Sequence, residues 1–147
     1  MSNGGVQMSF ASFIENVASG AGLPIDKRGP DLVTVNFDMG SGRKQIVWIA
    51  PIGQDHMSNL IVGFLSPALQ MQAGEDLGRK AANDLLRDNA KLYHGAWAIV
   101  TIEGTEYLAV VDTQIAHTMQ PEEFSATVGM VAALADEMEK KLGTDLF

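Results

Sequence analysis

The sequence contains no cysteine, and this absence removes several kinds of chemistry at once. Disulfide bonds, thiol nucleophiles and zinc sites built on thiolates are all excluded. The absence also suits a reducing compartment, and we expect a cytoplasmic protein. The chain has 147 residues, of which 46% are hydrophobic. Because a chain of this length buries a sizeable core, we predict a single domain over residues 1–147 that needs no cofactor.

Long hydrophobic runs are missing as well. The longest, near Leu60–Leu65 and Trp97–Ile102, are far shorter than the roughly 20 residues that a membrane-spanning helix needs. The opening residues, MSNGGVQMSF, show no basic segment followed by an apolar one. We therefore expect no secretory signal, no membrane contact, and a frayed segment over residues 1–8.

Basic residues are too few and too scattered for a nucleic-acid site. The chain has 18 acidic and 10 basic residues and a net charge of −8. Without a basic stripe along one face, binding to a phosphate backbone is not expected. Two interpretations of the acidic surface remain open: it keeps the protein soluble, or it binds basic or amphipathic segments of other proteins. The basic residues fall mainly in four pairs: Lys27-Arg28, Arg43-Lys44, Arg79-Lys80 and Lys140-Lys141.

Signatures of catalysis and metal binding are also absent. His56, His94 and His117 lie in three different connecting segments, without the spacing of metal ligands. No GxSxG motif marks a nucleophile. We therefore predict no enzyme activity, no metal and no catalytic residue. A cluster of these histidines around a buried acid would overturn this prediction.

Other polar groups have ordinary structural interpretations. The glycine-rich segment Asp38–Gly42 is expected between two strands, so it predicts a hairpin turn and not a phosphate-binding loop. The acidic residues Asp136, Glu137 and Glu139 are expected on the solvent-facing surface of a helix. Paired-carboxylate hydrolysis would need a cleft, for which the sequence gives no sign.

Apolar spacing predicts three helices. The first covers roughly residues 9–20 with Ser9 as its N-cap, and the second covers about Glu75–Leu92. The third begins at Pro121 and ends before Gly143. We expect the second helix to bury Leu77, Ala81, Leu85 and Leu86, and the third to bury Phe124, Val128, Val131, Ala135, Met138 and Leu142.

Alternating and continuous apolar runs predict five strands. Three of them form a meander: Leu32–Asp38, then Lys44–Ala50 closed by Pro51, then Asn59–Leu65. The segment 97–112 adds a hairpin that turns at residues 103–106. The order α-β-β-β-α-β-β-α indicates an α+β fold with helices packed on an antiparallel sheet. Residues 23–31 and 113–120 are expected as connectors, and residues 66–74 are ambiguous.

The predicted hairpin is apolar on both faces. A strand with one solvated face would alternate between apolar and polar residues. We therefore expect a helix on one side of the hairpin, and on the other a second helix, a second subunit or a partner segment. The candidate contact residues on the hairpin are Trp97, Ile99, Leu108 and Val110.

Small residues and methionines supply further candidate contacts. Gly129 and Ala133 lie on one face of the last predicted helix, where glycine costs roughly 1 kcal/mol against alanine. This cost indicates either the close approach of another backbone or simple tolerance on a solvent-facing surface. Met119 lies at the edge of an element, where methionine either fills a gap in the core or adapts to a partner.

In the stretch LLRDNAKLYHGAWAIVTIEGTEYLAVVD, a helix ending in Leu85-Leu86 is followed by Asn89, by a short link to Gly95 and by a tight hairpin, and a Pro-Glu-Glu helix start comes later. We expect Asn89 to bond local backbone at the helix end. This order resembles the type III secretion chaperone-like superfamily. Within it, the chain is similar to the YbjN-type regulators and the CesT/SycE-type class I chaperones, best over residues 76–142. The resemblance implies helices against a twisted sheet, and commonly a bacterial homodimer.

The resemblance also implies a class of function. Class I secretion chaperones hold an extended segment of a partner protein on apolar patches without ATP, and YbjN-type proteins are described as regulatory. We therefore expect a protein-binding module with no catalytic residues. A regulator that senses a small molecule in a pocket between sheet and helices is the alternative.

Overall fold

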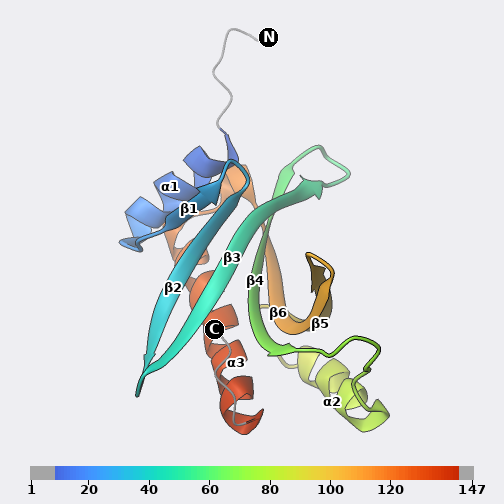
Figure 1. Cartoon of the computed structure of the whole chain (residues 1–147). Coiled ribbons are helices and arrows are strands. Elements are labelled where there is room, and N and C mark those ends of the chain that lie inside the picture. Colours follow the sequence, from blue (N-terminus) through green and yellow to red (C-terminus); the bar gives the residue numbers. More distant parts are fainter. Residues whose placement is uncertain (1–8, 143–147) are drawn as a thin grey trace, which may run out of the picture.

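A computed structural model describes residues 9–142 of the chain and has the predicted α+β architecture. Helices pack on one twisted antiparallel sheet (Figure 1). The helices are α1 (Phe10–Ala21), α2 (Arg79–Asn89) and α3 (Pro121–Leu142), with a short 3-10 turn η1 (Ala116–Thr118). The strands are β1 (Asp26–Gly29), β2 (Leu32–Gly40), β3 (Arg43–Gln54), β4 (Leu60–Gln70), β5 (Ala96–Ile102) and β6 (Thr105–Ile115).

The strands lie in the order β1-β2-β3-β4-β6-β5. Every neighbouring pair is antiparallel, so β1 to β4 form a meander and the β5–β6 hairpin is added with β6 next to β4. This arrangement leaves β1 at one edge of the sheet and β5 at the other.

Helices α1 and α3 pack on the same face of the sheet and enclose the core. The α3 helix contacts β2, β3, β4 and β6, and α1 packs against α3 and β2. Phe64 of β4 and Phe124 of α3 meet edge to face with ring centroids 6.0 Å apart. The core also contains the alternating inward residues of the central strands: Val33, Val35, Val47, Ile49, Val62 and Val110.

Both core-covering helices end where local chemistry dictates. Ser9 caps α1 by accepting a hydrogen bond from the Ser12 N–H, and Gly22 ends the helix in the left-handed conformation. In α3, acidic residues occupy the first turn and Lys140 and Lys141 the last turn, where each complements the helix dipole. The predicted bounds of both helices are therefore confirmed, whereas Leu142, which we expected α3 to bury, is 45% exposed at the end of the helix.

The opposite face of the sheet has no helix over it within residues 9–142. Trp48 of β3 and Tyr107 of β6 project from this face and meet edge to face, with centroids 6.4 Å apart and planes at 84°. Since β4 lies between their two strands, the sheet must curl for the rings to meet. Ala109 of β6 faces the same way and is fully buried. Curvature thus shields part of this helix-free face.

Three strand predictions need correction. Asp26–Gly29, expected as part of a connector, pairs with β2 as an additional edge strand. Pro51 does not close β3, because a register shift between Pro51 and Gly53 lets the strand continue to Gln54. The ambiguous stretch after Leu65 extends β4 to Gln70 through a further shift near Pro67.

The hairpin and the second helix also differ from expectation. The turn contains only Glu103 and Gly104, and β6 runs on to Ile115. The α2 helix covers Arg79–Asn89 and has no buried residue. Its predicted apolar stripe therefore does not enter the core.

The acidic face predicted on the last helix is only partly exposed. Glu137 is exposed, whereas Asp136 and Glu139 are buried at 3% and 0% exposure. Burial of Asp136 is possible because Arg43 of β3 donates a hydrogen bond to its carboxylate. The predicted fraying of residues 1–8 lies outside the described residues.

Candidate protein-binding site

The β5–β6 hairpin fixes which backbone groups point out of the sheet. Glu103 and Gly104 both have positive φ, 50° and 83°, which produces a two-residue turn that matches the twist of the strands. Ile102 and Thr105 flank this turn as a pair. Because hydrogen-bonded pairs alternate along an antiparallel ladder, the N–H and C=O groups of Trp97, Ile99 and Thr101 point away from β6.

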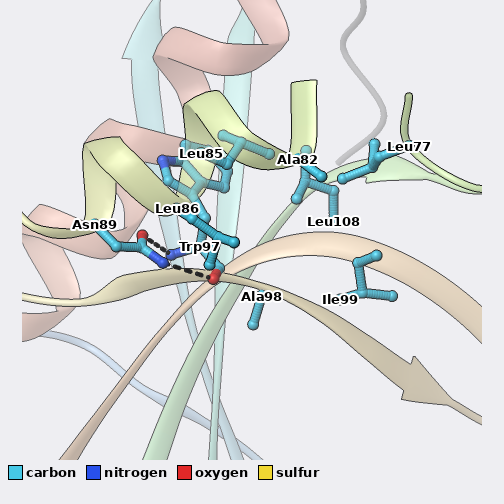
Figure 2. Close-up of a pocket in the computed structure, with 9 residues that line it drawn as sticks. All are labelled: Leu77, Ala82, Leu85, Leu86, Asn89, Trp97, Ala98, Ile99 and Leu108. Atoms are coloured by element: carbon cyan, nitrogen blue, oxygen red, sulfur yellow. Dashed lines mark hydrogen bonds between the residues drawn. The ribbon is translucent and has the colours of Figure 1, made fainter. Parts of the chain in front are cut away.

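Asn89, the last residue of α2, binds the first of these outward positions. Its amide oxygen accepts from the Trp97 N–H at 2.7 Å, and its Nδ2 donates to the Trp97 carbonyl at 3.2 Å. Both hydrogen bonds are drawn in Figure 2. The two contacts confirm the outward direction of the backbone at Trp97. They also anchor the end of α2 to the edge of the sheet.

The next two outward positions on β5 are unpaired. Within residues 9–142, no hydrogen bond is found to the outward backbone groups of Ile99 and Thr101. The strand reads AWAIVTI, without charge or proline. An apolar edge of this kind is a template for pairing with another chain.

The opposite edge of the sheet is protected. The β1 strand has only four residues, DKRG, and all are exposed. A register shift interrupts its pairing between Lys27 and Gly29, and Pro30 follows. Short length, charge, bulges and proline all oppose the addition of a further strand. The two edges therefore differ, and only β5 offers a regular acceptor.

An apolar groove lies between α2 and β5. Figure 2 shows Leu85 and Leu86 of α2 on one side and Ile99 of β5 on the other. Leu86 is 67% exposed and Ile99 is 48% exposed, which is high for large aliphatic side chains. The groove has a volume of about 260 Å³. Its lining consists of Leu77, Ala82, Leu85, Leu86, Asn89, Trp97, Ala98, Ile99 and Leu108.

The structure brings three of the predicted contact residues together. Trp97, Ile99 and Leu108 all line the groove, although Leu108 itself is buried. Val110 and Met119 are instead core residues with 0% and 5% exposure, so neither offers a surface to a partner. Val110 is the hairpin residue that belongs to the core covered by α3. Met119 also belongs to this core, so it fills a gap there and does not adapt to a partner.

The two small residues predicted on the last helix lie apart from the groove. Ala133 is exposed and Gly129 is partly exposed on α3. A Cβ placed on Gly129 would meet nothing within 4 Å. No backbone of the described chain therefore approaches Gly129 closely, and the contact within the domain that we considered is not there.

Sequence reasoning missed the role of α2. Leu77, Leu85 and Leu86 were expected in the core, but they line a surface groove. Asn89 was expected to bond its own helix end, but its partner is a strand residue eight positions further on. Apolar spacing places such residues on one helix face, yet it does not say whether that face meets a core or remains open.

Charges near the groove balance one another along α2. Asp84 accepts hydrogen bonds from Lys80 at 2.7 Å and Arg87 at 3.1 Å. The hydrogen bond from Lys80 lowers the pKa of Asp84, and the same bond raises the pKa of Lys80. These three charged groups pair with one another within α2, and none of them lines the groove. The groove itself is therefore apolar.

Within residues 9–142, no group of three or more histidine, cysteine or acidic residues could hold a metal ion. The nearest approach of histidine to an acid is His94 Nδ1, 3.9 Å from Asp112 Oδ2. In the same part of the chain, no helix combines the length and the apolarity needed to cross a bilayer.

Comparison with known proteins adds no relative: no protein-family model and no curated protein matches this sequence.

Proposed function

We propose that this protein is a non-enzymatic protein-binding module that holds an extended partner segment along the groove between α2 and β5. The observation that carries the proposal is the unpaired edge at Ile99 and Thr101, directly beside an exposed apolar groove. A segment added here gains backbone hydrogen bonds from the strand, and its alternate side chains reach the groove.

Charge favours particular partners. The protein has a net charge of −8, whereas the groove contains no ionisable side chain. Long-range attraction therefore brings basic chains to the surface, and the local contact selects apolar side chains. We propose that the partner segment is apolar at alternate positions and flanked by Lys or Arg.

A peptide selection tests this proposal. Random 12-residue peptides displayed on phage would be selected on the wild-type protein and then measured against Ile99→Asp and Met57→Asp. Met57 is 71% exposed and lies in the β3–β4 loop, so it is a matched apolar-to-acid control outside the groove. We expect selected peptides to bind wild type and Met57→Asp and to lose at least about tenfold in affinity for Ile99→Asp, because a carboxylate would be desolvated in the groove.

Trp97 provides a direct signal for the same experiment. The chain has two tryptophans, Trp48 and Trp97, and only Trp97 lines the groove. In a Trp48→Phe background, peptide binding should shift the emission of the remaining tryptophan. The proposal fails if no peptide is enriched, or if Ile99→Asp binds as well as wild type. Self-association that Ile99→Asp abolishes would assign the edge to a second copy and would also contradict it.

We further propose a cytoplasmic homodimer of the type that the secretion-chaperone resemblance implies. The absence of cysteine and the helix-free face around Trp48 and Tyr107 support this proposal, since that face is a second apolar surface away from the groove. Light scattering tests it directly. Ile46 alternates with the buried Gln45 and Val47 of β3, so it lies on the helix-free face beside Trp48. We expect Ile46→Lys to halve the mass and Met57→Lys to leave it unchanged. A wild-type monomer at all concentrations would rule out the dimer.

A small-molecule sensor is the second candidate, and the volume of the apolar groove is the observation that favours it. The cavity of about 260 Å³ is slightly below the roughly 300–1,000 Å³ of typical ligand pockets. Its polar side-chain groups are the Asn89 amide, which is already bonded to the backbone of Trp97, and the indole N–H of Trp97. Few groups remain to orient a ligand, so the protein-binding proposal has more support. A thermal-shift screen with metabolites would distinguish the two.

A further inference from the structure

Asn89 imitates one residue of an added strand. A paired strand would offer Trp97 one carbonyl acceptor and one N–H donor, and the Asn89 side chain offers the same two groups at 2.7 and 3.2 Å. The first outward position of β5 is therefore occupied by a group of the protein itself, whereas the next two, at Ile99 and Thr101, are unpaired.

The α2 helix is otherwise weakly attached. None of its residues is buried, and the ion pairs of Asp84 with Lys80 and Arg87 remain within the helix. Within the described chain, the two bonds of Asn89 are the side-chain hydrogen bonds that join α2 to the sheet. The open groove between α2 and β5 means that part of the apolar side of the helix, including the exposed Leu86, has no packing partner.

We propose that α2 is a displaceable cover of the β5 edge, and that Asn89 competes with the entering strand for Trp97. This inference rests on the proposed function, because it assigns a regulatory role at the same site. With Asn89 in place, an entering segment can pair with two outward residues, Ile99 and Thr101. When Asn89 leaves, Trp97 becomes available and the acceptor edge lengthens to three.

Competition of this kind makes a quantitative prediction. A segment long enough to reach Trp97 binds fully only to the fraction of molecules in which Asn89 is released, so its apparent affinity is reduced by that fraction. Removing the Asn89 amide should therefore strengthen the binding of long segments. It should not affect segments that pair with Ile99 and Thr101 alone.

Hydrogen exchange tests the release of Asn89 without any partner. We expect Asn89→Ala to speed exchange of the Trp97 amide at least about tenfold. The Ala98 amide, which points toward β6, should be unchanged and serves as an internal control. Asn83→Ala is the matched variant, because it makes the same change at an exposed position of α2. If the Trp97 amide exchanges equally in Asn89→Ala and wild type, the inference is wrong.

Binding measurements test the competition itself. Peptides selected on wild type would be trimmed into long and short versions and measured against Asn89→Ala, Asn89→Asp and Asn83→Ala. We expect at least about threefold tighter binding of the long peptide to Asn89→Ala and no change for Asn83→Ala. The isosteric Asn89→Asp keeps the acceptor but loses the donor to the Trp97 carbonyl, so we expect an intermediate gain in affinity for the long peptide. If Asn89→Ala does not fold, the comparison of Asn89→Asp with wild type tests the competition.

The outcomes separate this inference from the proposed function. Peptides that bind wild type but bind Asn89→Ala equally or more weakly would show Asn89 to be a fastener of α2, which overturns the competition and leaves the protein-binding proposal intact. If no peptide binds any variant, the proposed function fails and the inference fails with it, whatever the exchange rates show.

Discussion

Arg43 and Asp136 join the start of β3 to the end of α3 although 93 positions separate them in the sequence. Arg43 Nε lies 3.0 Å from Asp136 Oδ1, and the arginine also donates to the Asp136 carbonyl at 3.4 Å. The Asp136 side chain is 4% exposed and that of Arg43 is 19% exposed. This pair allows a carboxylate to lie under the last turns of α3.

Removing Arg43 should therefore lower the free energy of unfolding more than removing an exposed cation does. We expect Arg43→Met to lower the free energy of unfolding by about 2–3 kcal/mol, because it leaves a buried carboxylate with only Lys140, at 3.5 Å. The matched control is Lys27→Met, since the Lys27–Glu15 pair is about half exposed and should contribute less than about 1 kcal/mol. Urea unfolding measures both. Equal losses of unfolding free energy in the two variants would show that burial of the Arg43–Asp136 pair adds nothing to its contribution.

Proline substitutions in β5 should separate its free edge from its paired side. We expect Thr101→Pro to fold with nearly normal stability, because its N–H points away from β6, and yet to lose binding of selected peptides. Val100→Pro removes a ladder hydrogen bond toward Tyr107 and should lower stability by about 2 kcal/mol or more. Thermal unfolding and peptide titration measure the two effects. Retained binding by folded Thr101→Pro would contradict strand addition at this edge.

Two glycine-to-alanine substitutions should change the stability of the protein in opposite directions. We expect Gly129→Ala to stabilise the protein by up to about 1 kcal/mol, because α3 gains helix propensity and the new Cβ meets nothing within 4 Å. Gly95→Ala should destabilise it by about 1–3 kcal/mol, because Gly95 has φ +81° and a Cβ there would lie 3.1 Å from Val110. Denaturant unfolding compares them. A loss of stability in Gly129→Ala, or a loss of self-association, would instead point to a second copy packed on that face of α3.

The β3–β4 loop should respond to acid through Asp55. Its carboxylate accepts hydrogen bonds from the backbone N–H groups of Asn59 and Met57, at 3.0 and 2.9 Å. The bond from the Asn59 backbone is the main cause that lowers the pKa of Asp55 below 3.8. A lowered pKa stabilises the folded loop above about pH 4, and this contribution is lost as pH falls through the folded value.

An NMR titration of the Asn59 amide measures that transition. We expect its chemical shift to be constant above about pH 5 and to change with a midpoint below 3.8. In Asp55→Asn the acid-dependent change should disappear. A midpoint at or above 3.8 in the wild-type protein would mean that the Asn59 bond does not favour the charged carboxylate.

Much of the fold could be predicted because it depends on local periodicity and on end signals. Ser9 and Pro121 mark the starts of α1 and α3 through their own backbone and side-chain chemistry. The hairpin follows from two apolar runs separated by Glu103 and Gly104. The β1 strand was missed because DKRG has no apolar alternation, and only pairing with β2 makes it a strand.

The candidate site was predictable only in part. Trp97 and Ile99 could be selected because both faces of the hairpin are apolar, which indicates contacts on both sides. Leu85 and Leu86 were placed in the core, because helical spacing is the same for a helix that covers a sheet and for one that borders a groove. Nothing in the sequence indicated that Asn89 would bind the backbone of Trp97.

By itself, the sequence determined the helices that cover the core, the strands that alternate, and the absence of thiol chemistry, since these depend on residue type and short-range spacing. The tertiary structure decided which sheet edge remains open, that Asp136 is buried against Arg43, and that α2 lies over β5 and not in the core. Those features depend on which distant segments meet, and the free energy of such contacts is set by the whole packed sheet.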